Sequence, residues 1–252
     1  MERYLIPANG PETEPIKTAL VLASKLGQNI RGQVEVVLVT PSKNIFGTTL
    51  ELVVGQDVIK VLEKGNSITL SGNISMKLES ERTLNVYRSY KILIALYPNK
   101  RMLDKIDSIK DCAHTIIVPW TMESIEEWAG TWSPKVIGND IPQKQITIDN
   151  PVVEEAMKLL TGAVNLSTGL SHPSDKAAAV ELFRILFKNR EEFDPTSIKA
   201  WALQHGWSTS GANQIRDIAE AINNRRPIRG GTHPHWREDI MKVLRESALS
   251  NT

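Results

Sequence analysis

The chain has 252 residues, of which 41% are hydrophobic and 23% charged, and its formal net charge is +1. These values are typical of a globular protein with one large or two modest domains, and they exclude a strong overall attraction to nucleic acid or membrane. The single cysteine, Cys112, excludes an intrachain disulfide and cysteine-rich zinc motifs. Because no stretch has the pattern of a membrane span or a signal peptide, we expect a cytoplasmic protein without membrane contacts.

Short apolar runs alternate with longer amphipathic segments as far as about residue 137. The apolar runs predict strands near residues 3–7, 34–40, 91–97 and 114–119, and residues 67–78 predict a strand or a small hairpin. The segments after the first two strands, 11–27 and 49–65, have helical spacing and end on glycine. This alternation predicts a Rossmann-like α/β domain over residues 1–137, with a mostly parallel sheet of about five strands.

Each of the four clearest strands is followed by a proline, at Pro7, Pro41, Pro98 and Pro119. Proline has no N–H group and ends a strand ladder, and the carboxyl ends of parallel strands lie at one edge of the sheet. We call the loops that follow these four strands the rim. Ligands of open α/β sheets bind outside such carboxyl ends, although the prolines are equally compatible with strand termination alone.

The rim carries amide, hydroxyl and cationic side chains that suit a phosphate or another small anion near helix N-termini. The predicted ligand-binding residues are Asn9, Ser42, Lys43, Asn99, Lys100, Arg101 and Trp120.

A polar, proline-containing linker over residues 138–150 precedes an all-helical domain, which we predict over residues 151–252 with about five helices. Ser174 is the expected N-cap of one helix. Asp194 is the expected N-cap of the next, with Pro195 in its first turn.

Residues 197–218 have the spacing of a helix-turn-helix, with Ala202 in the first helix and Gly206 at the turn. The second helix, Thr209 to Asn223, would read base edges, and the three arginines that follow it would contact phosphates. The predicted nucleic-acid-binding residues are Asn213, Gln214, Arg216, Arg225, Arg226 and Arg229. Gly211 inside this helix argues against the motif, and the alternative is a helix pair in a small bundle with solvated arginines.

Common catalytic and nucleotide-binding motifs are absent from the sequence: it contains no GxxxxGK[ST], GxGxxG, GxSxG, HExxH or CxxC. We therefore assign no catalytic residue and no cofactor. His233 and His235 lack a third ligand at a suitable spacing, so we predict no metal site. Cys112 and His114 are attributed to core packing, because a free cysteine at the start of a buried strand is usually inert.

The order of an α/β domain and a helix-turn-helix-like domain resembles that of ligand-sensing regulators, including the CRISPR-associated Rossmann-fold regulators. The resemblance lies in domain order and brings no residue motif with it. The leading interpretation is a non-catalytic sensor or regulator. In it, a small anionic, nucleotide-like ligand at the rim is coupled to a helical domain that contacts DNA or protein.

Two alternatives remain open at this point. One is an enzyme acting on a nucleotide or phosphorylated metabolite, with His172 and Asp175 in the polar loop before a helix as residues of interest. The other is an interaction scaffold that docks a partner through exposed aromatic side chains, namely Trp128, Trp132 and Trp236.

Overall fold

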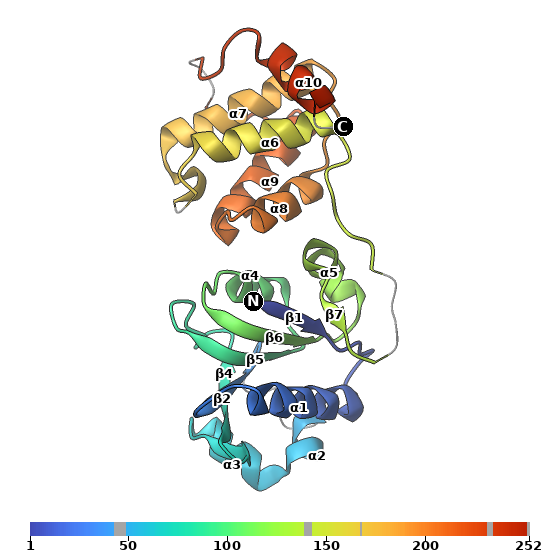
Figure 1. Cartoon of the computed structure of the whole chain (residues 1–252), viewed down its shortest axis with the longest axis vertical. Helices are drawn as coiled ribbons and strands as arrows, with labels where there is room; N and C mark the ends of the chain where they lie inside the picture. Colours follow the sequence, from blue (N-terminus) through green and yellow to red (C-terminus); the bar gives the residue numbers. More distant parts are fainter. Residues whose placement is uncertain (43–48, 139–142, 167, 231–233, 251–252) are drawn as a thin grey trace. The chain divides into compact units, whose positions relative to one another are not determined.

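The computed structural model describes the chain except for residues 43–48, 139–142, 167, 231–233 and 251–252. The chain divides into two units, residues 1–144 and 145–252, which we call the α/β domain and the helical domain (Figure 1). Across the residues described, no helix combines the length and apolarity needed to cross a bilayer. A mixed α/β region with a mostly parallel sheet and a helical C-terminal region are both confirmed.

In the part of the chain that the structure describes, the sheet has seven strands in the order β3-β4-β2-β5-β6-β1-β7. All neighbouring strands are parallel except β3 and β4, which form a hairpin, one of the two alternatives expected for residues 67–78. The strands are β1 (Glu2–Leu5), β2 (Val34–Thr40), β3 (Ile68–Ser71), β4 (Ile74–Ser80), β5 (Tyr90–Leu96), β6 (Cys112–Val118) and β7 (Lys135–Val136). The expected number of about five was too low, because the hairpin supplies two strands and the two-residue β7 has no pattern of its own.

The helices of the α/β domain are α1 (Thr13–Gln28), α2 (Thr49–Val54), α3 (Gln56–Glu63), α4 (Lys100–Asp107) and α5 (Glu126–Trp132), with a 3-10 turn η2 (Glu123–Ile125). The single helix expected over residues 49–65 is two helices. Gly55 between them has a φ of 90°, a conformation that an α-helix does not contain and that glycine adopts at little cost.

Both faces of the sheet are buried. Val36 and Leu38 of β2 pack on the face covered by α1, α2 and α3. Val37 and Val39 of the same strand pack on the opposite face, against α4 and α5 (Figure 1). Two covered faces explain why the strands are continuous apolar runs instead of alternating ones.

The helical domain comprises α6 (Pro151–Ala163), a 3-10 turn η3 (Gly169–Ser171), α7 (Pro173–Lys188), α8 (Pro195–Gln204), α9 (Thr209–Asn223) and α10 (Ile240–Ser250). Their buried apolar side chains form one core, which includes Val153, Phe183 and Ile215. The prediction of about five helices in this region is confirmed for its described residues.

Three of these helices begin with a polar N-cap followed by proline. Asp194 caps α8 as expected, accepting a hydrogen bond of 2.8 Å from the backbone N–H of Ser197. The expected cap Ser174 was wrong. His172 caps α7, because Pro173 occupies the first helical position and the ring Nδ1 accepts from the N–H of Ser174 at 3.3 Å.

Helix α9 lies against α7, α8 and η3, and its approach to η3 requires glycine. A Cβ atom on Gly211 would lie 3.0 Å from the Cα of Gly169, closer than real Cβ atoms ordinarily come to backbone. One turn along, the side-chain carbonyl of Gln214 accepts from the N–H of Leu170 at 3.0 Å. Gly211, which weakens the helix in isolation, is therefore required by the packing of η3.

We expect Gly211→Ala to destabilise the protein by about 1–3 kcal/mol, because the added methyl group overpacks against backbone that has no rotamer to change. Gly162→Ala in α6 is the matched control: its Cβ would meet nothing within 4 Å, and the better helix propensity of alanine should stabilise by up to about 1 kcal/mol. Urea unfolding of both variants measures the difference. Equal effects of the two substitutions would show that the Gly169 contact does not constrain α9.

A buried ion pair ties β1 to α4 and α5 in the α/β domain. Arg3 lies 3.8 Å from the carboxylate of Asp107, and its guanidinium stacks 3.5 Å from the ring centroid of Trp132. The indole N–H groups of Trp132 and Trp128 donate to the same carboxylate at 3.1 and 3.3 Å. Burial raises the pKa of Asp107 from 3.8 to about 6, against the opposing effects of the indole donors and Arg3.

This raised pKa predicts a pH-dependent contribution to stability. Because the folded protein retains the proton more strongly than the unfolded chain, the contribution is complete below pH 3.8 and is lost as pH rises through about 6. Relative to Asp107→Asn, we expect the wild-type free energy of unfolding to fall by up to about 3 kcal/mol between about pH 4 and about pH 7. Asp57→Asn, a change at an exposed carboxylate that leaves Asp107 in place, is the control and should show the same fall relative to Asp107→Asn as the wild-type protein. A wild-type protein that gains stability over this range would mean that Arg3 outweighs burial.

Candidate functional site

The pairing of the strands brings the rim together. Strands β2, β5, β6 and β1 are neighbours in this order and are all parallel, so their carboxyl ends lie at one edge of the sheet. The prolines that follow them, Pro7, Pro41, Pro98 and Pro119, therefore share that edge, as expected.

The helices that follow these strands diverge at two places along the rim. Helices α1, after β1, and α2, after β2, cover one face of the sheet, whereas α4 and α5, after β5 and β6, cover the other (Figure 1). Neighbouring loops therefore leave in opposite directions between β2 and β5 and between β6 and β1. Such switch points are where open α/β sheets bind ligands.

Each switch point carries part of the predicted set. Ser42 and Asn99 follow β2 and β5, and Asn9 and Trp120 follow β1 and β6. Ser42 and Asn9 are exposed, and the loops at the second point are joined by a hydrogen bond of 2.7 Å from Gly10 N–H to the carbonyl of Trp120. Lys43 lies outside the described residues.

The described cations of the rim are paired with carboxylates. Lys100 lies 3.4 Å from Glu127, and Arg101 lies 3.0 Å from Glu81. Asn99 caps α4 by accepting from Met102 N–H at 2.8 Å, and its amide donates to Glu81 at 3.0 Å. An anionic ligand that binds Lys100 or Arg101 must therefore compete with Glu127 or Glu81.

Among the rim residues that the structure describes, two aromatic rings lie against each other. Trp120 is 47% exposed, and Tyr97 packs edge-on against it with ring centroids 5.1 Å apart. Tyr97 has a φ of 52°, in the left-handed region, which is costly for a bulky side chain and concentrates at functional sites. Burial raises the pKa of the Tyr97 hydroxyl. Tyr97 was missed from the sequence, because nothing in an apolar run before proline signals a left-handed residue.

The residues predicted to read base edges are largely engaged within the helical domain. Gln214 holds Leu170, as described above, and the guanidinium of Arg216 forms an ion pair of 2.7 Å with Asp217. Asn213 is half-buried. Gln214 can therefore reach a base only by releasing Leu170 of η3.

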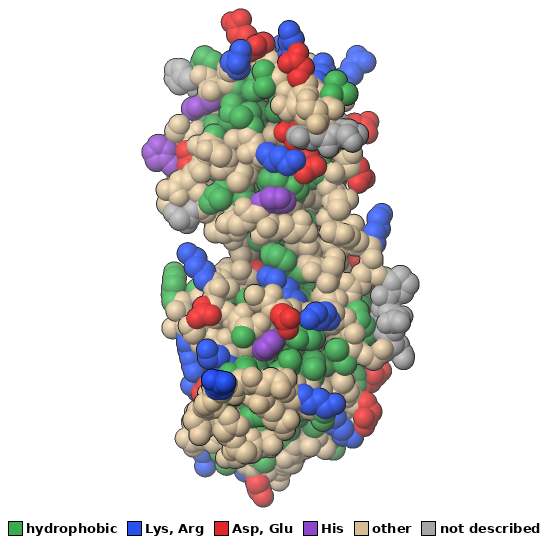
Figure 2. Space-filling view, viewed as in Figure 1, with side chains coloured by type: hydrophobic (Ala, Val, Ile, Leu, Met, Phe, Trp, Pro, Cys, Tyr) green, Lys and Arg blue, Asp and Glu red, His purple; other side chains and the backbone are tan. Residues whose placement is uncertain are grey.

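The three predicted phosphate-binding arginines follow α9 and are exposed. Arg226 lies 3.4 Å from Glu220, and the guanidinium carbon of Arg225 lies 6.0 Å from the ring centroid of Phe187. Arg229 lies in the segment whose carbonyls are held by Arg184, which donates to Ile228 and Gly230 at 2.8 Å. On the face shown in Figure 2, side chains of both signs are interspersed over each domain, as the net charge of +1 implies.

The expectation of exposed docking tryptophans was wrong. Trp128 is buried and Trp132 half-buried, because both donate to Asp107 inside the α/β domain. Trp236 is half-buried and donates to the carbonyl of Ala178 at 2.9 Å. Their indole groups serve the fold of each domain.

The polar residues considered for catalysis also have structural partners. His172 caps α7, and Asp175 accepts from the backbone N–H of Asn165 at 3.3 Å. The thiol of Cys112 is buried, which raises its pKa, and it lies 3.4 Å from the hydroxyl of Thr115. Within the described ranges, no three His, Cys, Asp or Glu side chains gather as a metal site would require, and His233 lies outside those ranges.

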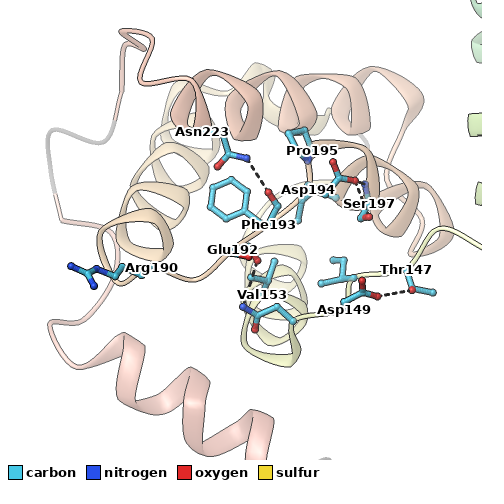
Figure 3. A pocket seen from close by; sticks show the side chains of 13 residues that line it. Thr147, Asp149, Val153, Arg190, Glu192, Phe193, Asp194, Pro195, Ser197 and Asn223 are labelled. Atoms are coloured by element: carbon cyan, nitrogen blue, oxygen red, sulfur yellow. Dashed lines mark hydrogen bonds between the residues drawn. The ribbon is translucent and has the colours of Figure 1, made fainter.

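A groove of about 650 Å³ in the helical domain was not anticipated from the sequence (Figure 3). It lies between the loop segments 147–150 and 190–194 and is closed by side chains of α6, α8 and the end of α9. The available signal was the pair of Asn-Pro and Asp-Pro helix starts at residues 150 and 194, whose polar caps line it. Their proximity depends on tertiary packing that no local pattern reveals.

Comparison with known proteins bears on the helical domain alone. No curated protein and no solved structure shows significant similarity to the chain. Residues 149–245, which span most of the helical domain, are similar to a family described as a domain of unknown function, DUF1889.

Proposed function

We propose that the protein is a non-catalytic sensor or regulator that binds a small anionic, nucleotide-like ligand at the rim of a Rossmann-like domain. The observation that carries this proposal is the pairing of the exposed Trp120 with the strained Tyr97 at the carboxyl edge of the sheet. Strain that the fold maintains at a ligand-binding edge is a feature of functional sites.

The chemistry of the rim supports a ligand with a planar ring and a negative charge. The exposed indole of Trp120 offers a face for a base, and aromatic stacking contributes about 1–3 kcal/mol per base. Lys100 and Arg101 stand in the first turn of α4, where the helix N-terminus also favours an anion. Because Glu127 and Glu81 already neutralise these cations, the ligand gains less from them than from free cations.

We further propose that α8 and α9 act as a helix-turn-helix-like pair through which the helical domain contacts DNA. The exposed Arg225, Arg226 and Arg229 support contacts with phosphates. Gln214 already holds η3, which favours a backbone-directed contact over base reading by that side chain. A protein partner at this surface is the alternative that the experiments below separate.

Nucleotides at saturating concentration should raise the unfolding temperature of the wild-type protein. Trp120→Ala and the double variant Lys100→Ala with Arg101→Ala should each remove this shift, because the stacking face or the charge partners are lost. A ligand at about 100 times its Kd adds about 2.7 kcal/mol, so loss of binding is readily measured by thermal unfolding.

The matched control for the rim variants is Arg31→Ala with Lys110→Ala. These exposed cations precede β2 and β6, at the opposite edge of the sheet, and their removal changes the net charge equally. A shift that persists in the rim variants, or that disappears in the control, would refute the rim as the binding site.

The triple variant Arg225→Ala, Arg226→Ala and Arg229→Ala should weaken binding to all duplex DNA sequences alike. We expect the slope of log Kd against log salt to decrease by about three between about 50 and about 200 mM salt, since each phosphate contact contributes about one. Fluorescence anisotropy with two unrelated duplexes measures it.

The exposed Lys158, Lys176 and Lys242, changed together to alanine, are the control for bulk charge in the same domain. If the wild-type protein binds neither duplex, with or without a nucleotide, the DNA-binding proposal is wrong. The helical domain would then be assigned to binding a protein partner.

A further inference from the structure

The groove of the helical domain has the size and floor of a small-molecule site. Its volume of about 650 Å³ lies within the range of about 300–1,000 Å³ that is usual for ligand pockets. Ile148 and Phe193 are half-buried at its floor, and beneath them lie the fully buried Val153 of α6 and Ile198 of α8. Figure 3 shows Phe193 between these helices, with the amide of Asn223 bonded to its carbonyl.

Carboxylates surround this apolar floor. Asp149, Glu192 and Asp194 line the groove and are exposed, and Arg190 is the one cation among the lining residues described. Three negative charges against one positive charge leave the lining at −2. The charge alone therefore disfavours an anionic ligand in this groove.

The walls that carry the carboxylates are held in place by hydrogen bonds. Asn223 donates to the carbonyl of Phe193 at 2.9 Å, and Asn150 donates to Glu191 at 3.1 Å. Asp194 uses Oδ2 to cap α8, and Asp149 uses Oδ1 to accept from the hydroxyl of Thr147 at 3.2 Å. Each carboxylate retains acceptor capacity, because an ionised carboxylate has about four acceptor sites on its two oxygens.

We propose that this groove binds a small organic dication, an alkyl diamine or polyamine, with its methylene chain on the apolar floor and its ammonium groups at the carboxylates. A neutral apolar molecule would desolvate the carboxylates without compensation, and an inorganic cation would make no use of the accessible apolar surface of Ile148 and Phe193. An aliphatic chain with charged ends satisfies both parts of the lining. The proposal is independent of ligand binding at the rim.

Calorimetric titration of the full chain with cadaverine tests the proposal, with pentanediol as a neutral molecule of the same chain length. We expect cadaverine to bind and the diol to bind at least about tenfold more weakly, a difference of about 1.4 kcal/mol. Asp149→Asn and Glu192→Gln each remove one charge with little change of shape. Each variant should raise the Kd of cadaverine severalfold and should unfold at the same temperature as the wild-type protein. Asp194 is left unchanged because it caps α8.

Glu238→Gln is the matched control, since Glu238 is an exposed carboxylate of the same domain outside the groove lining. Equal binding of the diol, equal weakening by Glu238→Gln, or unchanged Kd in both groove variants would overturn the proposal. So would binding of an oligolysine peptide without binding of cadaverine, which would identify the groove as a docking surface for a basic protein segment.

Discussion

Burial of both faces of the parallel sheet is the constraint on which the α/β domain depends. A parallel strand needs a crossover to reach its neighbour, and the two apolar faces both need helices to cover them. Both requirements are met because α1, α2 and α3 cover one face and α4 and α5 cover the other. The switch points at the rim are a consequence of this division, so the location of the candidate site follows from how the core is covered.

In the helical domain, the corresponding constraint is the contact between η3 and α9. The backbones of Gly169 and Gly211 come together, and Gln214 bonds to Leu170 beside them. The contact places the 3-10 turn η3 against the helix that was expected to read DNA. Gln214, whose side-chain amide could hydrogen-bond a base edge, therefore stabilises the domain itself.

Local features of the sequence predicted the local parts of the structure. Apolar runs located the strands, and the Asp194-Pro195 pair located a helix start, because burial and capping act over a few residues. Gly55 could have indicated the break between α2 and α3, but a glycine inside an amphipathic run is also compatible with a continuous helix. What the sequence did not predict depends on contacts between distant residues. The left-handed Tyr97, the hydrogen bond from Trp128 to Asp107, and the groove lined by Asp149 and Asn223 are such cases.

The different environments of the tryptophans have a practical consequence for spectroscopy. Trp120 is 47% exposed at the rim, whereas Trp128 in the same domain and Trp201 and Trp207 in the helical domain are buried. A collisional quencher in the surrounding solution therefore reaches the indole at the rim in preference to these three. The native protein thus contains an optical reporter at its candidate ligand site, and it needs no attached dye.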